Sequence, residues 1–467
     1  MRGHHANRPH AMTDEERGLI ISHIQSFRGR VSHYSRRKTR KVYLPEDINI
    51  SKMHAMFVEK HPNVKCSYDT YRDTFNNKFN ISFGYPRKDT CTTCDKLKVK
   101  LDSLNCKLNQ TSLDSDTSID LQRRKDRITA TLELHQRKGE VFYERKKASR
   151  IEAQNNDDVE AVCFDFQKNL PLPNVTTQDV YFSRQLSFYS FNIHILSSDK
   201  VFFYCYDETV GKKGADDVSS MLNDFFTNHL PQTVRNLRLF CDSCAGQNKN
   251  WTVLRLMFYL VHTTKRFNTI TMSFPVRGHS YMECDRDMAN VNQAFPAELP
   301  KDWRNVLEST RAKPEPFNVI NFPCEKFLKY SEFLQPHFLA SCPFASRPIR
   351  ELKICAGQPH LIQFRNSWNG PFTSAPVTKR NGRCCGARKG RQAAVARVAA
   401  PAYPKQAYPG PLPISHAKFK DLSKLKDFVS EDNKAFYDNL PHEGQTVNQV
   451  DSEPECITDS DSDSDSE

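Results

Sequence analysis

Three aspartates in the middle of the sequence have the type and position needed to bind divalent cations. Asp165 lies in one run of strand-forming residues, Asp242 follows a second run and Asp285 follows a third. Two divalent cations about 3.5 to 4 Å apart, held by a few carboxylates, can activate an attacking oxygen and stabilise a leaving one. We therefore predict that these three residues are catalytic and bind Mg²⁺ or Mn²⁺. Glu283 and Asp287 lie close enough in the sequence to replace Asp285 as the third ligand.

Polar side chains that can contact phosphate surround the second and third aspartates. Gln247, Asn248 and Lys249 follow Asp242 directly and offer hydrogen-bond donors for phosphate oxygens. His279 precedes the third aspartate and can orient a water molecule or a phosphate group, although a purely structural histidine fits the sequence equally well. We therefore predict that these four side chains contact the substrate.

A second kind of metal site is indicated nearer the N-terminus. Cys91 and Cys94 form a CxxC pair in a turn-rich segment, and a long polar helix predicted from about Ile119 to Gln154 carries His135. Two thiolates with this spacing can bind one tetrahedral zinc ion, with a histidine from a following helix as third ligand. A redox pair is less consistent with the sequence, because no strand precedes the pair and no helix begins at it. The candidates for the fourth ligand are Cys66, Cys106 and His61.

The central residues that must position the aspartates alternate between strand and helix patterns. Apolar and aromatic runs predict strands, and amphipathic runs predict helices. The predicted strands are Ala161 to Phe166, Gln185 to Leu196, Lys200 to Asp207, Asn236 to Cys241 and Thr269 to Phe274. The predicted helices are Ala215 to Leu230, Asn250 to Thr263 and a segment through Asn292. This order is that of the RNase H fold, so we predict an α/β protein with an RNase H-like mixed sheet.

The N-terminal part is predicted to be helical and basic. Thr13 and Glu16 have the spacing of a capping box at a helix start. Pro45 to Lys60 and Ser67 to Phe79 predict two helices across a tight turn, which fits either a helix-turn-helix with Arg72 as a DNA contact or an ordinary helical hairpin. A basic stretch from 28 to 41 can attract polyanions or simply form a solvated surface. Its predicted phosphate contacts are Arg36, Arg37, Lys38, Arg40 and Lys41.

Composition bounds the remaining possibilities. The 467 residues include 67 Lys and Arg against 55 Asp and Glu, a net charge of +12 that favours polyanionic partners. No apolar run approaches the roughly 20 residues of a membrane span, so we expect no membrane partner. Fifteen cysteines spread along the chain favour reduced thiols and metal ligands over a secreted disulfide scaffold. We expect a nuclear protein.

The C-terminal third is predicted to be partly disordered. Aromatic residues are dense between 315 and 361, where they form core or stack on nucleic-acid bases. A basic low-complexity linker and an acidic Ser/Asp tail lack the apolar residues to fold, and the tail serines suit acidophilic kinases. The predicted regions are a basic arm (1–42), a helical and zinc-knuckle region (43–155), the RNase H-like core (156–300), an aromatic-rich extension (301–375), the linker (376–410), a C-terminal helix (411–440) and the tail (441–467).

Three sequence blocks resemble a widespread family of transposase-like proteins of animal genomes. These blocks are FDFQKNLPLP at Phe164 to Pro173, CDSCAGQNKN at Cys241 to Asn250 and GHSYMECDRDM at Gly278 to Met288. The resemblance implies a DDE-type RNase H-like catalytic core with an N-terminal helical and zinc-knuckle DNA-binding region. It also implies that the three aspartates form the acidic triad, and that Cys91, Cys94 and His135 are zinc-knuckle residues. The residues after Asp285 depart from the family, which has an aromatic-Gly pair there.

Two functions from different classes follow from these observations. The first is a transposase or transposase-derived nuclease that hydrolyses and transfers DNA strands with two metal ions, with structural zinc and a possible homo-oligomeric assembly. The second is a domesticated nuclear protein that binds DNA or serves as a scaffold without catalysis. A nuclease acting on RNA is a third, weaker interpretation of the same fold.

Overall fold

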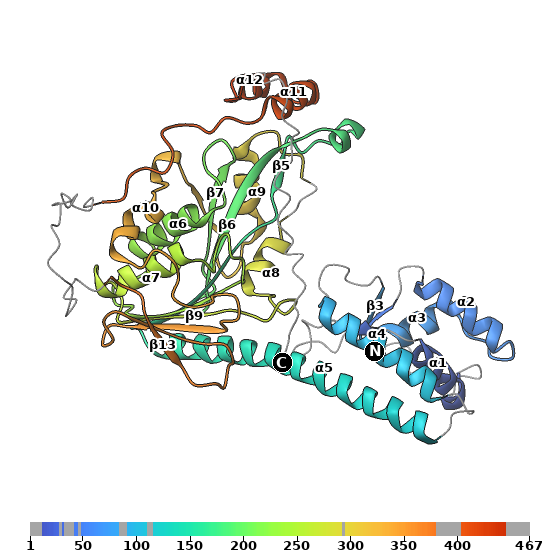
Figure 1. Cartoon of the computed structure of the whole chain (residues 1–467). Helices are drawn as coiled ribbons and strands as arrows, with labels where there is room; N and C mark the ends of the chain where they lie inside the picture. The colour runs from blue at the N-terminus through green and yellow to red at the C-terminus, as the bar shows by residue number, and fades with distance from the viewer. Residues whose placement is uncertain are drawn as a thin grey trace, which may run out of the picture. The chain divides into compact units, whose positions relative to one another are not determined.

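The computed structural model describes residues 12–27, 30–31, 42–44, 48–83, 91–109, 115–291, 295–379 and 403–444. The predicted contacts Arg36, Arg37, Lys38, Arg40 and Lys41 lie outside these residues, as do most of the linker and the acidic tail. The chain divides into two compact units (Figure 1). Unit 1 comprises Met1–Arg145 with Pro275–Tyr281, and unit 2 comprises Lys146–Phe274 with Met282–Glu467. Within the described ranges, the helices are too short or too polar to cross a membrane.

Unit 1 begins with three short helices around a small apolar core. They are α1 (Asp14–Ser26), α2 (Ile50–Lys60) and α3 (Tyr68–Lys78). The predicted capping box is confirmed, because the Thr13 hydroxyl accepts from the Glu16 N–H while the Glu16 carboxylate accepts from the Thr13 N–H. Both predicted helices of the hairpin are present. Their shared core consists of Ile20, Ile24, Leu44, Met53, Phe57, Tyr71 and Phe75.

Three short strands and two further helices complete unit 1. The strands β1 (Arg30–Val31), β2 (Val42–Leu44) and β3 (Ile81–Phe83) form one sheet, antiparallel between β1 and β2 and parallel between β2 and β3. The helix α4 (Thr92–Leu108) has Cys91 as its N-cap, so the expectation that no helix begins at the CxxC pair is wrong. The predicted long polar helix is present as α5 (Ser115–Asn155), and the boundary between the units falls within it.

Unit 2 is built on a ten-stranded mixed sheet. Its strand order is β10-β7-β6-β4-β8-β9-β11-β12-β13, with β5 also paired to β6. In its centre, β4 is parallel to β8 and β8 to β9, whereas β4 is antiparallel to β6 and β6 to β7. The central strands are β4 (Val159–Phe166), β5 (Leu170–Leu172), β6 (Leu186–Ile195), β7 (Val201–Asp207), β8 (Asn236–Cys241) and β9 (Thr269–Ser273).

Helices cover the central strands, which explains why these strands are apolar on both faces. The helices α6 (Ala215–Asn228) and α7 (Trp251–His262) contribute buried side chains to the main core, together with residues of β4 and β8. The helix α8 (Glu283–Ala289) contacts β4 and β6. The five predicted strands and the first two predicted helices are therefore confirmed, while the third helix ends at Ala289.

The segment after α8 extends the sheet at both edges. It contains α9 (Pro300–Thr310), β10 (Asn318–Asn321), α10 (Tyr330–Leu334), β11 (Glu351–Cys355), β12 (Leu361–Arg365) and β13 (Thr373–Pro376). Its aromatic residues, including Phe322, Phe327 and Phe338, are buried in the main core. The core interpretation of these aromatics is therefore confirmed. Two helices, α11 (His416–Leu425) and α12 (Glu431–Asp438), end the described chain.

Candidate functional site

Four side chains of unit 1 converge in a group that can hold a metal ion. They are Cys91, Cys94, His135 and His279, whose ligand atoms all lie within 4.8 Å of one another. The Cys91 sulfur is 3.1 Å from Nε2 of His135, and the Cys94 sulfur is 3.5 Å from Nε2 of His279. Two sulfurs and two imidazole nitrogens around one ion in tetrahedral geometry are separated by roughly 3.3 to 3.8 Å, as zinc bond lengths require. The four residues therefore fit an ion such as zinc.

Three elements position these ligands. Cys91 caps α4 and Cys94 lies in its first turn, so both sulfurs come from one end of a helix. His135 projects from the middle of α5, and His279 lies in the segment Pro275–Tyr281. The Tyr143 hydroxyl donates to the His279 carbonyl at 3.0 Å, which fixes that segment on α5. The hydrogen bond with Cys94 lowers the pKa of the Cys91 thiol, and the same contact raises the pKa of the Cys94 thiol.

Two glycines allow the close approach of the His279 segment. At Gly139, an added Cβ would lie 2.9 Å from Cγ of His279, so the imidazole packs directly on the helix backbone. At Gly278, an added Cβ would lie 2.6 Å from the Cys91 sulfur, and φ is +77°. Both features exclude a side chain at Gly278 without rearrangement of the metal site.

The fourth member of this group differs from the residues considered as fourth ligand. Cys106 is exposed on α4, and neither it, Cys66 nor His61 joins the group. His279 was predicted to contact water or phosphate and instead lies against Cys94. The sequence carried a weak signal for this pairing, because Gly278 and His279 stand together in a segment between a strand and a helix.

Two of the three aspartates lie side by side at the carboxyl ends of two central strands of the unit 2 sheet. Phe164 of β4 pairs with Cys241 of the parallel strand β8, so Asp165 and Asp242 follow paired residues at the carboxyl ends of adjacent strands. The Asp165 carboxylate accepts from the Phe166 N–H at 2.7 Å. The Asp242 carboxylate accepts from the Cys244 N–H at 3.1 Å.

The third aspartate, Asp285, influences the pKa of the Asp165 carboxyl group. Asp285 lies in the first turn of α8, where its carboxylate accepts from the Met282 N–H at 2.7 Å. Burial raises the pKa of Asp165 well above its ordinary value, and the negative charges of Asp242 and Asp285 raise it further. The three carboxyl groups therefore lie near enough to repel one another, although among the described residues they do not converge on one point as the Cys/His group does.

The alternatives to Asp285 are engaged elsewhere. Glu283 forms an ion pair with Lys146 at 2.6 Å; burial alone would raise its pKa, but the ammonium lowers it below its ordinary value. The Asp287 carboxylate lies 2.6 Å from Nδ1 of His194, whose Nε2 lies 3.1 Å from Asp199. Both ring nitrogens of His194 face carboxylate oxygens, and although burial lowers its pKa, the contact with Asp287 raises the pKa above its ordinary value.

Two polar side chains after Asp242 form hydrogen bonds within the protein instead of facing solvent. Asn248 is buried and its amide donates to Asp242 at 2.6 Å, which orients that carboxylate. Lys249 is also buried, donates to the carbonyls of Arg347 and Ile349, and has a pKa lowered to about 7 by burial first and then by Arg350. These two side chains therefore do not present free donors to a phosphate group. Gln247 is half-buried in the same turn.

A lysine that was not predicted lies near the acidic site. Nζ of Lys213 lies 2.9 Å from the Asn169 side-chain oxygen and 4.7 Å from the centre of the Phe166 ring. Its positive charge lowers the pKa of Asp165, opposing the effect of the two neighbouring carboxylates. No motif or spacing in the sequence singles out this lysine.

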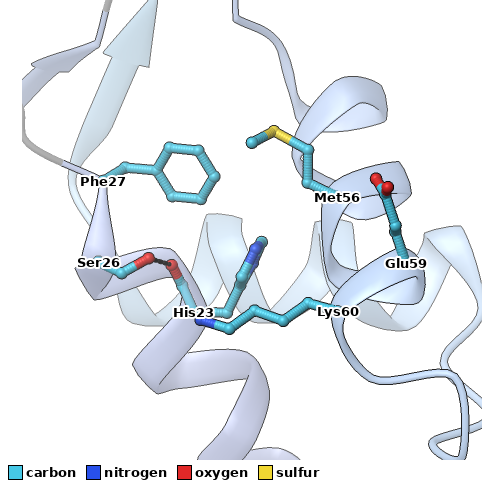
Figure 2. Close-up of a pocket in the computed structure, with 6 residues that line it drawn as sticks. All are labelled: His23, Ser26, Phe27, Met56, Glu59 and Lys60. Carbon is cyan, nitrogen blue, oxygen red and sulfur yellow. Dashed lines mark hydrogen bonds between the residues drawn. The ribbon is translucent and has the colours of Figure 1, made fainter.

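The surface of the N-terminal helices offers less to a ligand. The Arg72 guanidinium lies 3.0 Å from Asp69 and 3.5 Å from Asp73, so acids accompany the predicted DNA contact. A surface hollow of about 450 Å³ is lined by His23, Ser26, Phe27, Met56, Glu59 and Lys60 of α1, α2 and the residue that follows α1. Figure 2 shows these six side chains. None of these six residues was predicted to be functional. Burial lowers the pKa of His23, so its imidazole is neutral at pH 7.

Comparison with known proteins links part of unit 2 to one family. Residues 202–343 match a family described as a domain of unknown function, DUF7869. This range begins in β7, after Asp165, and includes Asp242 and Asp285. No curated protein and no solved structure matches the chain.

Proposed function

We propose that the chain is a DDE-type enzyme that cleaves and joins phosphodiester bonds in DNA, with an RNase H-like core in unit 2. The observation that carries this proposal is that buried Asp165 of β4 lies near enough to Asp242, which follows β8, and to Asp285 of α8 for their charges to raise its pKa. Protein chains gather buried like charges at a cost, and such groups are concentrated at functional sites.

The strand order supports the fold in this proposal. Three consecutive antiparallel strands, β4, β6 and β7, are followed by β8 and β9 on the other side of β4, both parallel to it. This strand order, with α6 between β7 and β8 and α7 between β8 and β9, is the one expected of an RNase H-like core and so supports the proposal. The strands β10 to β13 are then additions at the two edges.

The carboxylate oxygens of Asp165, Asp242 and Asp285 would hold Mg²⁺ or Mn²⁺, because these cations prefer hard oxygen ligands. The bound ions would supply charge to activate the attacking oxygen and to stabilise the leaving oxygen. Asn248 orients the Asp242 carboxylate, and Lys213 supplies a positive charge beside Asp165 to receive a phosphate group. Zinc in the Cys/His group would stabilise unit 1.

The proposal is tested with the full-length protein, supercoiled plasmid DNA and millimolar Mn²⁺. Asp165→Asn and Asp242→Asn are compared with Asp432→Asn, which changes an exposed aspartate of α12. We expect nicking by the wild type and the control variant, and loss of nicking in both triad variants. Nicking that survives Asp165→Asn would overturn the proposal. Manganese-independent DNA binding without any nicking would favour the domesticated, non-catalytic alternative.

A further inference from the structure

Two adjacent aromatic side chains are almost fully exposed in the connection between β5 and β6. The short helix η1 (Gln178–Phe182) ends with Tyr181 and Phe182, whose exposed fractions are 84% and 74%. Their ring centres are 4.9 Å apart in an edge-to-face arrangement. Large apolar side chains that project together into solvent are a recurring mark of binding surfaces.

The structure holds this aromatic pair out on a fixed support. β5 pairs with the first residues of β6, so the connection leaves and returns as a two-stranded ribbon. Thr177 caps η1 through its hydroxyl. At the other end, the main-chain N–H and the guanidinium of Arg184 both donate to Asp421 of α11, at 3.2 and 2.9 Å. Figure 1 shows this short green helix near α11. The exposed rings therefore belong to an anchored element.

The helix that anchors the ribbon adds positive charge. Lys420 and Lys424 of α11 are exposed, and neither forms an ion pair with a described residue. Asp421 lies between them in sequence, but Arg184 neutralises it. Lys424 follows Asp421 by three residues and so lies on the side of α11 that meets the ribbon.

We infer that Tyr181, Phe182, Lys420 and Lys424 form a binding surface for single-stranded nucleic acid. Aromatic rings beside unpaired cations are the combination that binds single strands, since the rings stack on bases and the cations contact phosphates. The inference rests on the proposed function for the identity of the ligand.

The surface also lies on a path that leads to the acidic site. Asp165 pairs with Asn192 of β6, and the ribbon begins at Leu186. Six residues of strand span about 20 Å, so Leu186, where the ribbon ends, lies about that far along β6 from the residue paired with Asp165. A nucleic-acid strand that reaches from the aromatic pair to the acidic residues would be held outside the reacting bond.

The experiment measures binding of fluorescein-labelled oligothymidylate to the full-length protein, in buffer free of Mg²⁺ and Mn²⁺. Tyr181→Ala/Phe182→Ala is compared with Tyr403→Ala, a variant of another exposed aromatic of unit 2. Stacking on one base contributes roughly 5- to 150-fold in affinity, so the double variant should bind at least about fivefold more weakly than the control. Lys420→Gln/Lys424→Gln should reduce the slope of log affinity against log salt by about 1.4, since each single-strand phosphate contact contributes about 0.7.

A second measurement does not depend on how much the rest of the chain binds. Bromodeoxyuridine placed in the oligonucleotide should cross-link under ultraviolet light to Tyr181 or Phe182, as read by peptide mass spectrometry. Equal affinity of the double variant and the Tyr403 control would overturn the inference, as would cross-links confined to other residues. A change in self-association with unchanged oligonucleotide affinity would assign the surface to contact between copies of the chain.

The two proposals fail in different assays. If the aromatic variant binds the oligonucleotide more weakly and the wild type does not nick DNA, the binding surface is supported and the catalytic function is rejected. If nicking needs Asp165 and the aromatic variant binds the oligonucleotide as the control does, the catalytic function is supported and the binding surface is rejected.

Discussion

Replacing Gly278 with alanine should damage the Cys/His metal site. An added Cβ would lie 2.6 Å from the Cys91 sulfur and 3.0 Å from its Cα, so backbone as well as side chain must move. The left-handed φ of +77° adds a cost of about 1 to 2 kcal/mol for a residue with a side chain. Overpacking of this kind adds about 1 to 3 kcal/mol. The variant should therefore lose about 2 to 5 kcal/mol, which corresponds to a zinc affinity roughly 30- to 5,000-fold weaker if the segment moves away to relieve the clash.

The assay is competition for zinc with a chromogenic chelator, together with thermal unfolding of the metal-loaded protein. Gly357→Ala is the matched control, since an added Cβ there meets nothing within 4 Å and its φ is not in the left-handed range. Gly278→Ala should release zinc at lower chelator concentration and unfold at lower temperature than this control. A Gly278→Ala protein that retains one zinc ion with wild-type affinity and unfolds with the control would refute both the close contact and the metal site built on it.

Three further predictions concern the buried charges of unit 2. Asp165→Asn should abolish the Mn²⁺ binding that calorimetry measures. In the wild type, the affinity for Mn²⁺ should rise with pH, because the raised pKa of Asp165 lets protons compete with the ion. An affinity for Mn²⁺ that does not change with pH would contradict this prediction. Lys146→Ala should reduce the free energy of unfolding by about 3 to 5 kcal/mol in denaturant titrations, because it leaves the Glu283 carboxylate buried and unpaired, whereas Lys147→Ala on the exposed side of α5 should be neutral. Burial lowers the pKa of Lys249 to about 7, so the unfolded chain binds the Lys249 proton more tightly than the folded chain does. The free energy of unfolding of the wild type should therefore rise relative to that of Lys249→Met between pH 7 and 9, by at most about 1.4 kcal/mol per pH unit. Parallel pH profiles of the two proteins in denaturant titrations would contradict the burial of this ammonium group.

The centre of the fold was predictable because its local patterns agree with its tertiary structure. β4, β6 and β7 are rich in β-branched and aromatic residues, and α6 and α7 are amphipathic, so their sequence patterns located each of them. The edge strands were not found. β10 and β13 have four residues each and are mostly exposed, and strands of that length carry too little pattern to distinguish from loops.

The members of the Cys/His group were predictable where the CxxC spacing and the helix that follows it mark them. Cys91 and Cys94 are three residues apart, so their shared role follows from the sequence, and His135 was found on the helix that follows. His279 is 185 residues from Cys94, and only the tertiary structure brings the two together. The signal that marks it is indirect, because Gly139 and Gly278 are needed only once the histidine segment is packed against α5 and Cys91.

Helix geometry bears on the choice among Glu283, Asp285 and Asp287, which the sequence left open. Residues four apart in a helix lie on one side, and the residue midway between them points about 200° away. Glu283 and Asp287 therefore share one side of α8, where Lys146 and His194 neutralise them. Asp285 lies on the other side, where its charge reaches Asp165. The two flanking acids cannot join the aspartate pair without breaking these ion pairs, whereas the charge of Asp285 is one of the two that raise the pKa of Asp165.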